Sequence, residues 1–239
     1  MHRRSGKNNT MRNSAPLIGI NTISTTLLLA TSSALLSACV SVPVINDLPA
    51  STQIDPIPQP NWSVGMKREM VDVRDGQQKG YEITELLPEG KLRGKSLESS
   101  KDEPCSWTGS IEWFAPAESW QNCGNGEWKS GTNAVKLISG GSLWPLKAGA
   151  RAEYRRTPTS SLGNKGTPET RKCEVIGPVA VSLSHAELDA IKVQCNTRRW
   201  DGAIESRIWY WTEQYGEIKY MRVHSSEGVK DSNEIVALP

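Results

Sequence analysis

The sequence lacks the residues and motifs that most often reveal catalysis or metal binding. It contains only three histidines among its 239 residues. No two of its five cysteines have the C-x-x-C spacing that is common in zinc and redox sites. No zincin, nucleophile-elbow or phosphate-loop motif is present. We therefore predict a protein with no catalytic residue, no metal and no cofactor.

The chain also lacks an excess of positive charge once its first residues are set aside. Four of the 28 Lys and Arg residues, and none of the 26 Asp and Glu residues, lie before residue 39. The remaining chain therefore carries 24 basic residues against 26 acidic ones. Nucleic-acid binding draws much of its affinity from basic side chains that neutralise phosphates. This composition excludes nucleic acid as an expected partner.

Residues 1–38 have the three parts of a secretion signal. The head, residues 2–12, carries four basic side chains, and residues 15–36 carry no charge and are rich in Leu, Ile, Ala, Ser and Thr. A basic head, an apolar middle and a small-residue exit are typical of exported proteins. Met11 is an alternative start to Met1, because the residue after it is again basic.

The signal ends in Leu36-Ser37-Ala38-Cys39, which resembles a bacterial lipobox. The resemblance implies transfer of diacylglycerol to the Cys39 thiol, cleavage between Ala38 and Cys39, and acylation of the new amine. Val40 stands where inner-membrane lipoproteins of this kind carry Asp, which implies an outer-membrane location. The alternatives are a plain cleaved signal or an uncleaved anchor, with Cys39 incidental.

A proline-rich segment follows the predicted lipidation site. Residues 40–61 contain five prolines, which excludes a helix or a central strand. We interpret this segment as an extended tether. The predicted organisation is a signal peptide at 1–38, a lipidated cysteine and tether at 39–61, and a β-rich globular domain at 62–239.

The globular part shows alternation of apolar and polar residues with a period of two. Residues 148–156 and 191–197 show it most clearly, as half-buried strands of an antiparallel sheet do. Asp201-Gly202 and Gly216 predict hairpin turns. We therefore predict an all-β domain with a single antiparallel, curved sheet, either a half-barrel or a meander.

Two segments do not follow this alternation. Residues 105–141 are predicted to form a loop-rich excursion or a pair of short strands. The spacing of Ser184 and Glu187 fits a capping box, so a short helical turn is expected at residues 184–190.

Four cysteines remain after Cys39, and an even number in an exported protein indicates two disulfides. Three pairings are open. We favour Cys105–Cys123 and Cys173–Cys195, because each pair is local and brackets a plausible turn. Each bond would close a loop of ~20 residues and stabilise the fold by about 3 kcal/mol.

All nine tryptophans follow Cys39. Tryptophan buries a large area while keeping one hydrogen-bond donor. Such residues build the core of a small β-domain or line a groove for a lipid or sugar, and the core interpretation is favoured. The candidate binding residues are Trp144, Trp200, Trp209 and Trp211.

A cryptic hydrolase is the remaining catalytic hypothesis. His224 could act as a base beside Asp231 or Glu227. Carboxylates that flank the aromatic strand at 209–211 could act as a pair only if a cleft holds them at a defined separation. The carboxylates in question are Glu205, Glu213 and Glu217.

The segment Gly141–Tyr154, with its Trp-Pro-Leu entry, is similar to an uncharacterised family of exported bacterial domains. Cys173, residues 191–195 and the hairpin from Ile208 to Gly216 continue the similarity. Phe114-Ala115-Pro116, Trp120 and Cys123 also resemble that family, so the similarity covers roughly residues 100–238. It implies a β-rich fold with paired cysteines and no known activity.

The leading functional hypothesis is a non-enzymatic lipoprotein of the outer membrane. Its acylated Cys39 would engage membrane lipid, and its β-domain would bind an apolar envelope ligand or a protein partner. A structural or assembly role in an envelope complex is the first alternative, and the cryptic hydrolase is the second.

Overall fold

The computed structural model describes residue 45, residues 47–98 and residues 103–237. The predicted signal peptide and the processing site at Ala38 and Cys39 lie outside the described residues. The described elements are β1 Leu48–Pro49, β2 Lys67–Asp72, β3 Gln78–Leu87, β4 Lys91–Ser96, β5 Ser106–Ser110, β6 Ser119–Gln121, the 3-10 helix η1 Gly126–Trp128, β7 Gly131–Gly140, β8 Arg151–Ser160, β9 Glu169–Ser182, β10 Glu187–Arg198, β11 Ile204–Thr212, β12 Gly216–His224 and β13 Gly228–Ile235.

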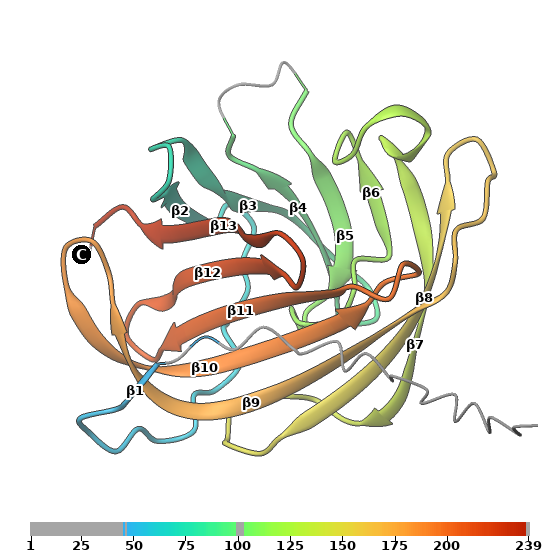
Figure 1. Cartoon of the computed structure of the whole chain (residues 1–239). Coiled ribbons are helices and arrows are strands. Elements are labelled where there is room, and N and C mark those ends of the chain that lie inside the picture. The colour runs from blue at the N-terminus through green and yellow to red at the C-terminus, as the bar shows by residue number, and fades with distance from the viewer. Residues whose placement is uncertain (1–44, 46, 99–102, 238–239) are drawn as a thin grey trace, which may run out of the picture. The chain divides into compact units, whose positions relative to one another are not determined.

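Strands β2 to β13 form a closed antiparallel barrel of twelve strands (Figure 1). Each strand pairs with the next along the chain, β13 pairs back to β2, and β8 pairs with β9 to complete the ring. The predicted all-β, antiparallel, curved sheet is thus confirmed. Its form is more specific than predicted, because the sheet closes on itself and a barrel leaves no unpaired edge.

The up-and-down order divides the connecting loops into two sets. The first set, which includes β5–β6, β7–β8 and β11–β12, lies at the end that we call the closed end. The second set, which includes β6–β7, β8–β9 and β10–β11, lies at the opposite or open end. The two ends differ in how their interior is filled.

The alternation in the sequence sets which side chains face the interior. On β9, Arg171, Cys173 and Val175 are buried and Lys172 between them is exposed. Apolar residues at every second position give each strand one inward face. The hairpins at Asp201-Gly202 and at Gly216 are confirmed, since Gly202 and Gly216 have φ of 81° and 68°.

Residues 105–141 form strands β5, β6 and β7. The region therefore contains three strands where the sequence suggested a loop-rich excursion or a pair of short strands, and β7 is longer than expected. The helical turn expected at residues 184–190 is wrong. β10 begins at Glu187, and the Ser184 backbone N–H donates to the Glu234 carboxylate (2.7 Å) and not to Glu187. A four-residue capping pattern is local, and strand pairing with β9 overrides it.

The closed end of the barrel is filled by aromatic side chains. Phe114, from the β5–β6 loop, is fully buried, with ring centroids 5.4 Å from those of both Trp144 and Trp209. Trp211 lies next to the same ring, 6.3 Å away between centroids. Leu143 and Leu146 from the β7–β8 loop complete this core.

A second core lies on the outer face of β11 to β13. The far part of the β9–β10 hairpin follows a bulge at Lys192/Val193 and bends over this face. Val181 packs there with Ile208 and Ile218. The bend explains why β11 is buried on both of its faces.

The proline-rich segment packs against the barrel over residues 47–61. β1 pairs with β9, and Asp47 forms an ion pair with Lys192. Asp189 accepts hydrogen bonds from the backbone and hydroxyl groups of Ser51 and Thr52. Prolines are compatible with this course because only β1, Leu48–Pro49, pairs with β9, and most of the segment has no strand partner that would need its N–H groups. This part of the expected tether is therefore a strap along the barrel.

Two disulfides join Cys105 to Cys123 and Cys173 to Cys195, the pairs favoured from the sequence. Cys173 and Cys195 are directly opposite each other on β9 and β10. No helix within the described residues is long and apolar enough to span a membrane.

Candidate functional site

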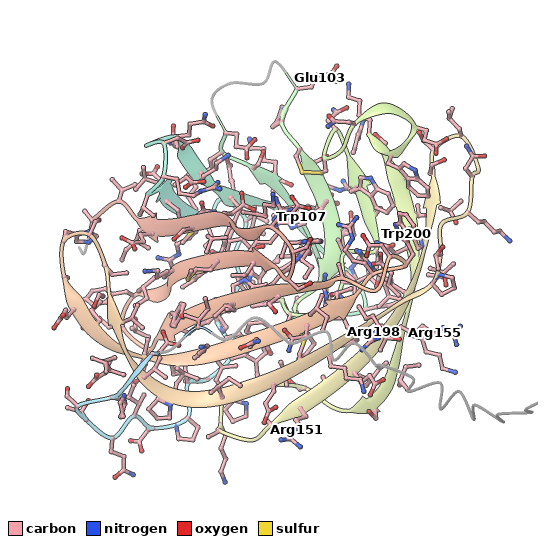
Figure 2. All side chains as sticks on the ribbon, in the orientation of Figure 1. Glu103, Trp107, Arg151, Arg155, Arg198 and Trp200 are labelled. Atoms are coloured by element: carbon pink, nitrogen blue, oxygen red, sulfur yellow. A yellow bond between two sulfur atoms is a disulfide. The ribbon has the colours of Figure 1, made fainter. Side chains whose placement is uncertain are left out.

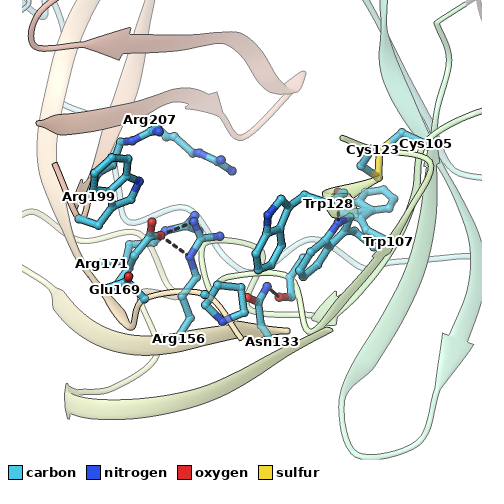
Figure 3. Close-up of a pocket in the computed structure, with 16 residues that line it drawn as sticks. Cys105, Trp107, Cys123, Trp128, Asn133, Arg156, Glu169, Arg171, Arg199 and Arg207 are labelled. Atoms are coloured by element: carbon cyan, nitrogen blue, oxygen red, sulfur yellow. Dashed lines mark hydrogen bonds and ion pairs between the residues drawn. A yellow bond between two sulfur atoms is a disulfide. The ribbon is translucent and has the colours of Figure 1, made fainter. Parts of the chain in front are cut away.

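A cavity of about 630 Å³ lies at the open end of the barrel. Strands β5 to β9, strand β11 and the neighbouring loops supply its walls (Figure 3). Its size falls within the range of small-molecule sites. One wall is made of indoles and the other of guanidinium groups. The indole wall consists of Trp107, Trp120 and Trp128, and the guanidinium wall consists of Arg156, Arg171, Arg199 and Arg207. We call this the Arg–Trp cavity.

Glycines set the position of the indole wall. Trp107 and Trp120 are directly opposite each other on β5 and β6, so both face the interior. A Cβ on Gly94 would lie 1.6 Å from the Trp107 ring, and one on Gly131 would lie 2.6 Å from the Trp120 ring. Each indole therefore lies flat over a strand position that has no side chain. This close approach is available only to glycine.

The third indole is held by the loop that contains η1. The Trp120 indole N–H donates to the Trp128 carbonyl oxygen at 3.0 Å, which ties β6 to this loop. The Cys105–Cys123 disulfide lines the same cavity (Figure 3). All three indoles are half-buried, unlike the fully packed rings of the closed end.

Three of the four arginines have a carboxylate partner. Arg156 forms two hydrogen bonds with Glu169. Arg207 donates to Glu205 at 2.9 Å, and Arg199 lies 3.8 Å from an Asp201 oxygen. These carboxylates offset the positive charge locally, and the hydrogen bonds of Glu169 and Glu205 orient the guanidinium groups of Arg156 and Arg207.

Arg171 is the exception. It is only 3 % exposed, and among the described residues it takes part in no ion pair with Asp or Glu. Its Nη1 donates to the Phe114 carbonyl oxygen at 3.3 Å, and its Nε donates to the Thr197 hydroxyl at 3.4 Å. Burial lowers the pKa of Arg171 well below its ordinary value, and the charges of Arg207 and Arg156 lower it further.

The surrounding interior is positively charged. Burial opposes ionisation of Glu205, yet the arginines around it, Arg207 first, lower its pKa to about 2. Arg222, which also acts on Glu205, has Asp231 as its own partner at 2.6 Å. The interior near the cavity therefore stabilises negative charge.

A second cavity of about 200 Å³ adjoins the first deeper in the barrel. Arg171, Arg207, Trp107 and Ala117 line both cavities. Most of the other residues that line the inner cavity are apolar or aromatic, such as Trp209, and Ser110 is a polar exception. The two arginines thus lie at the boundary between the two spaces.

The structure separates the four tryptophans that the sequence suggested as binding residues. Trp144, Trp209 and Trp211 are buried with Phe114 in the closed end, and Trp209 also borders the inner cavity. Trp200 lies on the β10–β11 loop at the edge of the Arg–Trp cavity and is 72 % exposed (Figure 2). Their role in binding stays a prediction.

Sequence reasoning missed the arginines. Arg156 and Arg171 occupy inward positions of β8 and β9, where the alternation predicts apolar side chains. A charged residue in phase with buried neighbours is the signal that would have pointed to them.

The candidate catalytic groups do not meet in the Arg–Trp cavity. His224 Nδ1 lies 3.0 Å from the Ser226 hydroxyl oxygen and 3.6 Å from a Glu227 carboxylate oxygen, so the structure brings together one of the two pairs that the sequence suggested. Glu217 is buried next to Tyr81, whose hydroxyl donates to it at 3.4 Å, and burial raises the pKa of Glu217 to about 7. Glu213 lies on the β11–β12 loop. The described residues hold no group of three or more His, Cys, Asp or Glu side chains suited to a metal ion.

No family model, curated protein or solved structure matches this chain. The function is therefore inferred from the site.

Proposed function

We propose that this chain is an exported lipoprotein whose barrel binds a small apolar or amphipathic ligand of the cell envelope without transforming it. The observation that carries the proposal is the Arg–Trp cavity, a ligand-sized space with three indoles on one wall inside a closed barrel. Indoles present large apolar faces at low entropic cost, and a closed barrel of this size can enclose a ligand.

The two disulfides support the exported location. Disulfides persist in oxidising compartments, such as the space outside the inner membrane. The lipobox-like ending at Cys39 supports acylation, and two or more acyl chains give stable anchoring.

The short link between Cys39 and the barrel limits the distance between the barrel and a membrane that holds the acylated cysteine. Only seven residues separate Cys39 from Asp47, which is fixed to Lys192 on the barrel wall. An extended chain spans about 3.5 Å per residue, so the barrel would lie within about 30 Å of the acylated cysteine. The attachment point of the strap on the barrel would thus stay close to the lipid surface.

The anchoring half of the proposal is tested by labelling cells with palmitate. Wild-type protein is expected to carry the label in the membrane fraction, and Cys39→Ser is expected to lose it. An unlabelled mature protein would contradict lipidation.

The binding half is tested by native mass spectrometry of protein released from envelopes. We expect a bound small molecule that is lost in Trp128→Ala and kept in Ile138→Ala, a matched change of an exposed residue on β7. A recurrent protein crosslink at the open end with no bound small molecule would overturn the proposal in favour of an assembly role.

A further inference from the structure

We infer that the Arg–Trp cavity takes an amphipathic anion, with a phosphate, sulfate or carboxylate group on Arg171 and Arg207 and an apolar body against the three indoles. The inference rests on the proposed function and names the chemistry of the ligand.

Basic side chains outnumber carboxylates in the cluster of charged residues beside the cavity. The inner cluster holds four arginines, Arg156, Arg171, Arg207 and Arg222, against three carboxylates. The carboxylates are Glu169, Glu205 and Asp231. Arg171 is the guanidinium left over, and it is also the most deeply buried of the four.

A buried guanidinium is costly without an anionic partner. Within the part of the chain that the structure describes, the hydrogen-bond partners of Arg171 are two neutral oxygen atoms at 3.3 and 3.4 Å, which are long contacts for a charged donor. Because Arg171 borders both cavities, an anion can reach it through the larger one. One bound anion would balance the cluster.

Arg207 makes the anion position specific. It lines both cavities with Arg171, and its positive charge is one of the causes that lower the pKa of Arg171. Two guanidinium groups facing one space suit an oxyanion, since each offers a planar fork of N–H donors.

The indole wall shows that an inorganic anion alone would leave most of the site empty. The cavity of about 630 Å³ is far larger than a phosphate group, and Trp107, Trp120 and Trp128 offer it no charge. Apolar walls with a few polar groups are typical of sites for amphipathic molecules. The ligand therefore has both parts.

The test uses the acylated protein in phosphatidylcholine nanodiscs, titrated by calorimetry with empty discs subtracted. The probes are octyl phosphate, octanol and inorganic phosphate. We expect octyl phosphate to bind at least tenfold more tightly than either of the other two. Arg171→Met is expected to reduce its affinity to that of octanol.

The matched control is Arg155→Met. Arg155 is exposed on the outer side of β8 and points away from the barrel (Figure 2). The Arg155→Met substitution removes the same charge as Arg171→Met but leaves the cavity unchanged, so the affinity for octyl phosphate should not change. Equal loss in both variants would overturn the inference, because it would reflect net charge only.

The other outcomes separate the two levels of the proposal. If octanol and octyl phosphate bind equally well and Arg171→Met changes neither affinity, the inference that the ligand is an anion is overturned, and the proposed function stays intact. Equal binding of inorganic phosphate and octyl phosphate overturns the amphipathic ligand. Binding of none of the probes overturns both the inference and the proposed function.

Phosphatidic acid added to the nanodiscs distinguishes a lipid headgroup from a free molecule as the source of the anion. If the ligand is a membrane lipid, phosphatidic acid added to the discs will compete with octyl phosphate. If it is a free molecule, octyl phosphate affinity will be the same with and without phosphatidic acid.

Discussion

The two ends of this barrel use the same side chain for opposite purposes. At the closed end Trp144, Trp209 and Trp211 pack around Phe114 and are buried. At the open end Trp107 and Trp120 lie against glycines and leave a cavity in front of them. The two ends differ in what faces their indoles. At the closed end the β5–β6 loop places Phe114 against the indoles, whereas at the open end arginine side chains face them across the Arg–Trp cavity.

The comparison shows that tryptophan content alone does not define a binding site. A space remains where the opposite wall cannot collapse onto the rings. Charged side chains resist collapse because their burial without partners is costly.

The largest expected effect comes from removing the ring that fills the closed end. Phe114→Ala should lower the free energy of unfolding by about 3–5 kcal/mol, because it leaves a cavity in the aromatic core. Chemical denaturation measures this change. Trp128→Ala at the open end should cost far less, and similar losses in both variants would contradict the distinction between the two ends.

The two ends should also differ in their response to pH. Burial raises the pKa of Glu217, near the closed end, from 4.5 to about 7. The folded state therefore binds this proton more tightly than the unfolded state does. The stability gained from the bound proton is full below pH 4.5 and is lost as the pH rises through 7, with a total of about 3 kcal/mol. Glu217→Gln should remove this dependence in unfolding curves measured between pH 4 and 8.

Glu205 is the contrasting carboxylate. Despite its burial, Arg207 and its neighbours lower its pKa from 4.5 to about 2. Its contribution is present above pH 4.5 and is lost as the pH falls through 2. At pH 8, Glu205→Gln should therefore destabilise the protein and Glu217→Gln should stabilise it. Changes of the same sign in the free energy of unfolding of the two variants would contradict the opposite pKa shifts of Glu205 and Glu217.

A smaller effect is expected from the glycine beneath the indole wall. In Gly94→Ala the new methyl group would overlap the Trp107 ring, so the ring must move. Overpacking of this kind costs about 1–3 kcal/mol, and the displaced indole should weaken octyl phosphate binding in the same calorimetric assay. Gly141→Ala is the control, since a Cβ there meets no atom within 4 Å. Equal effects of the two changes would show that Trp107 has no special position.

The smallest expected change in stability comes from Arg171. Without ligand, Arg171→Met should leave the free energy of unfolding within about 1 kcal/mol of the wild-type value or raise it, because it removes a buried charge that forms no ion pair with any described carboxylate. Thermal unfolding checks this prediction. A large loss of stability would assign Arg171 a structural role through Phe114 and Thr197 instead.

Much of the fold was predictable because its signals are local. The alternation at 148–156 and 191–197, the turn at Asp201-Gly202 and the two cysteine pairs each depend on neighbouring residues or on adjacent strands. The failure at residues 184–190 is also instructive, since the β9–β10 hairpin is held there by contacts with β12 and β13.

The sequence by itself determined the all-β, antiparallel class and the inward faces of the clearest strands, because a period of two and a short turn are properties of the local chain. It favoured the correct cysteine pairs without excluding the other two pairings. Only the tertiary structure decided that the sheet closes, that the proline-rich segment lies along it, and which indoles face open space. It also brought Arg156, Arg171, Arg199 and Arg207 together from separate strands and loops. Those outcomes depend on pairing and packing between residues far apart in the chain, and no local pattern encodes them.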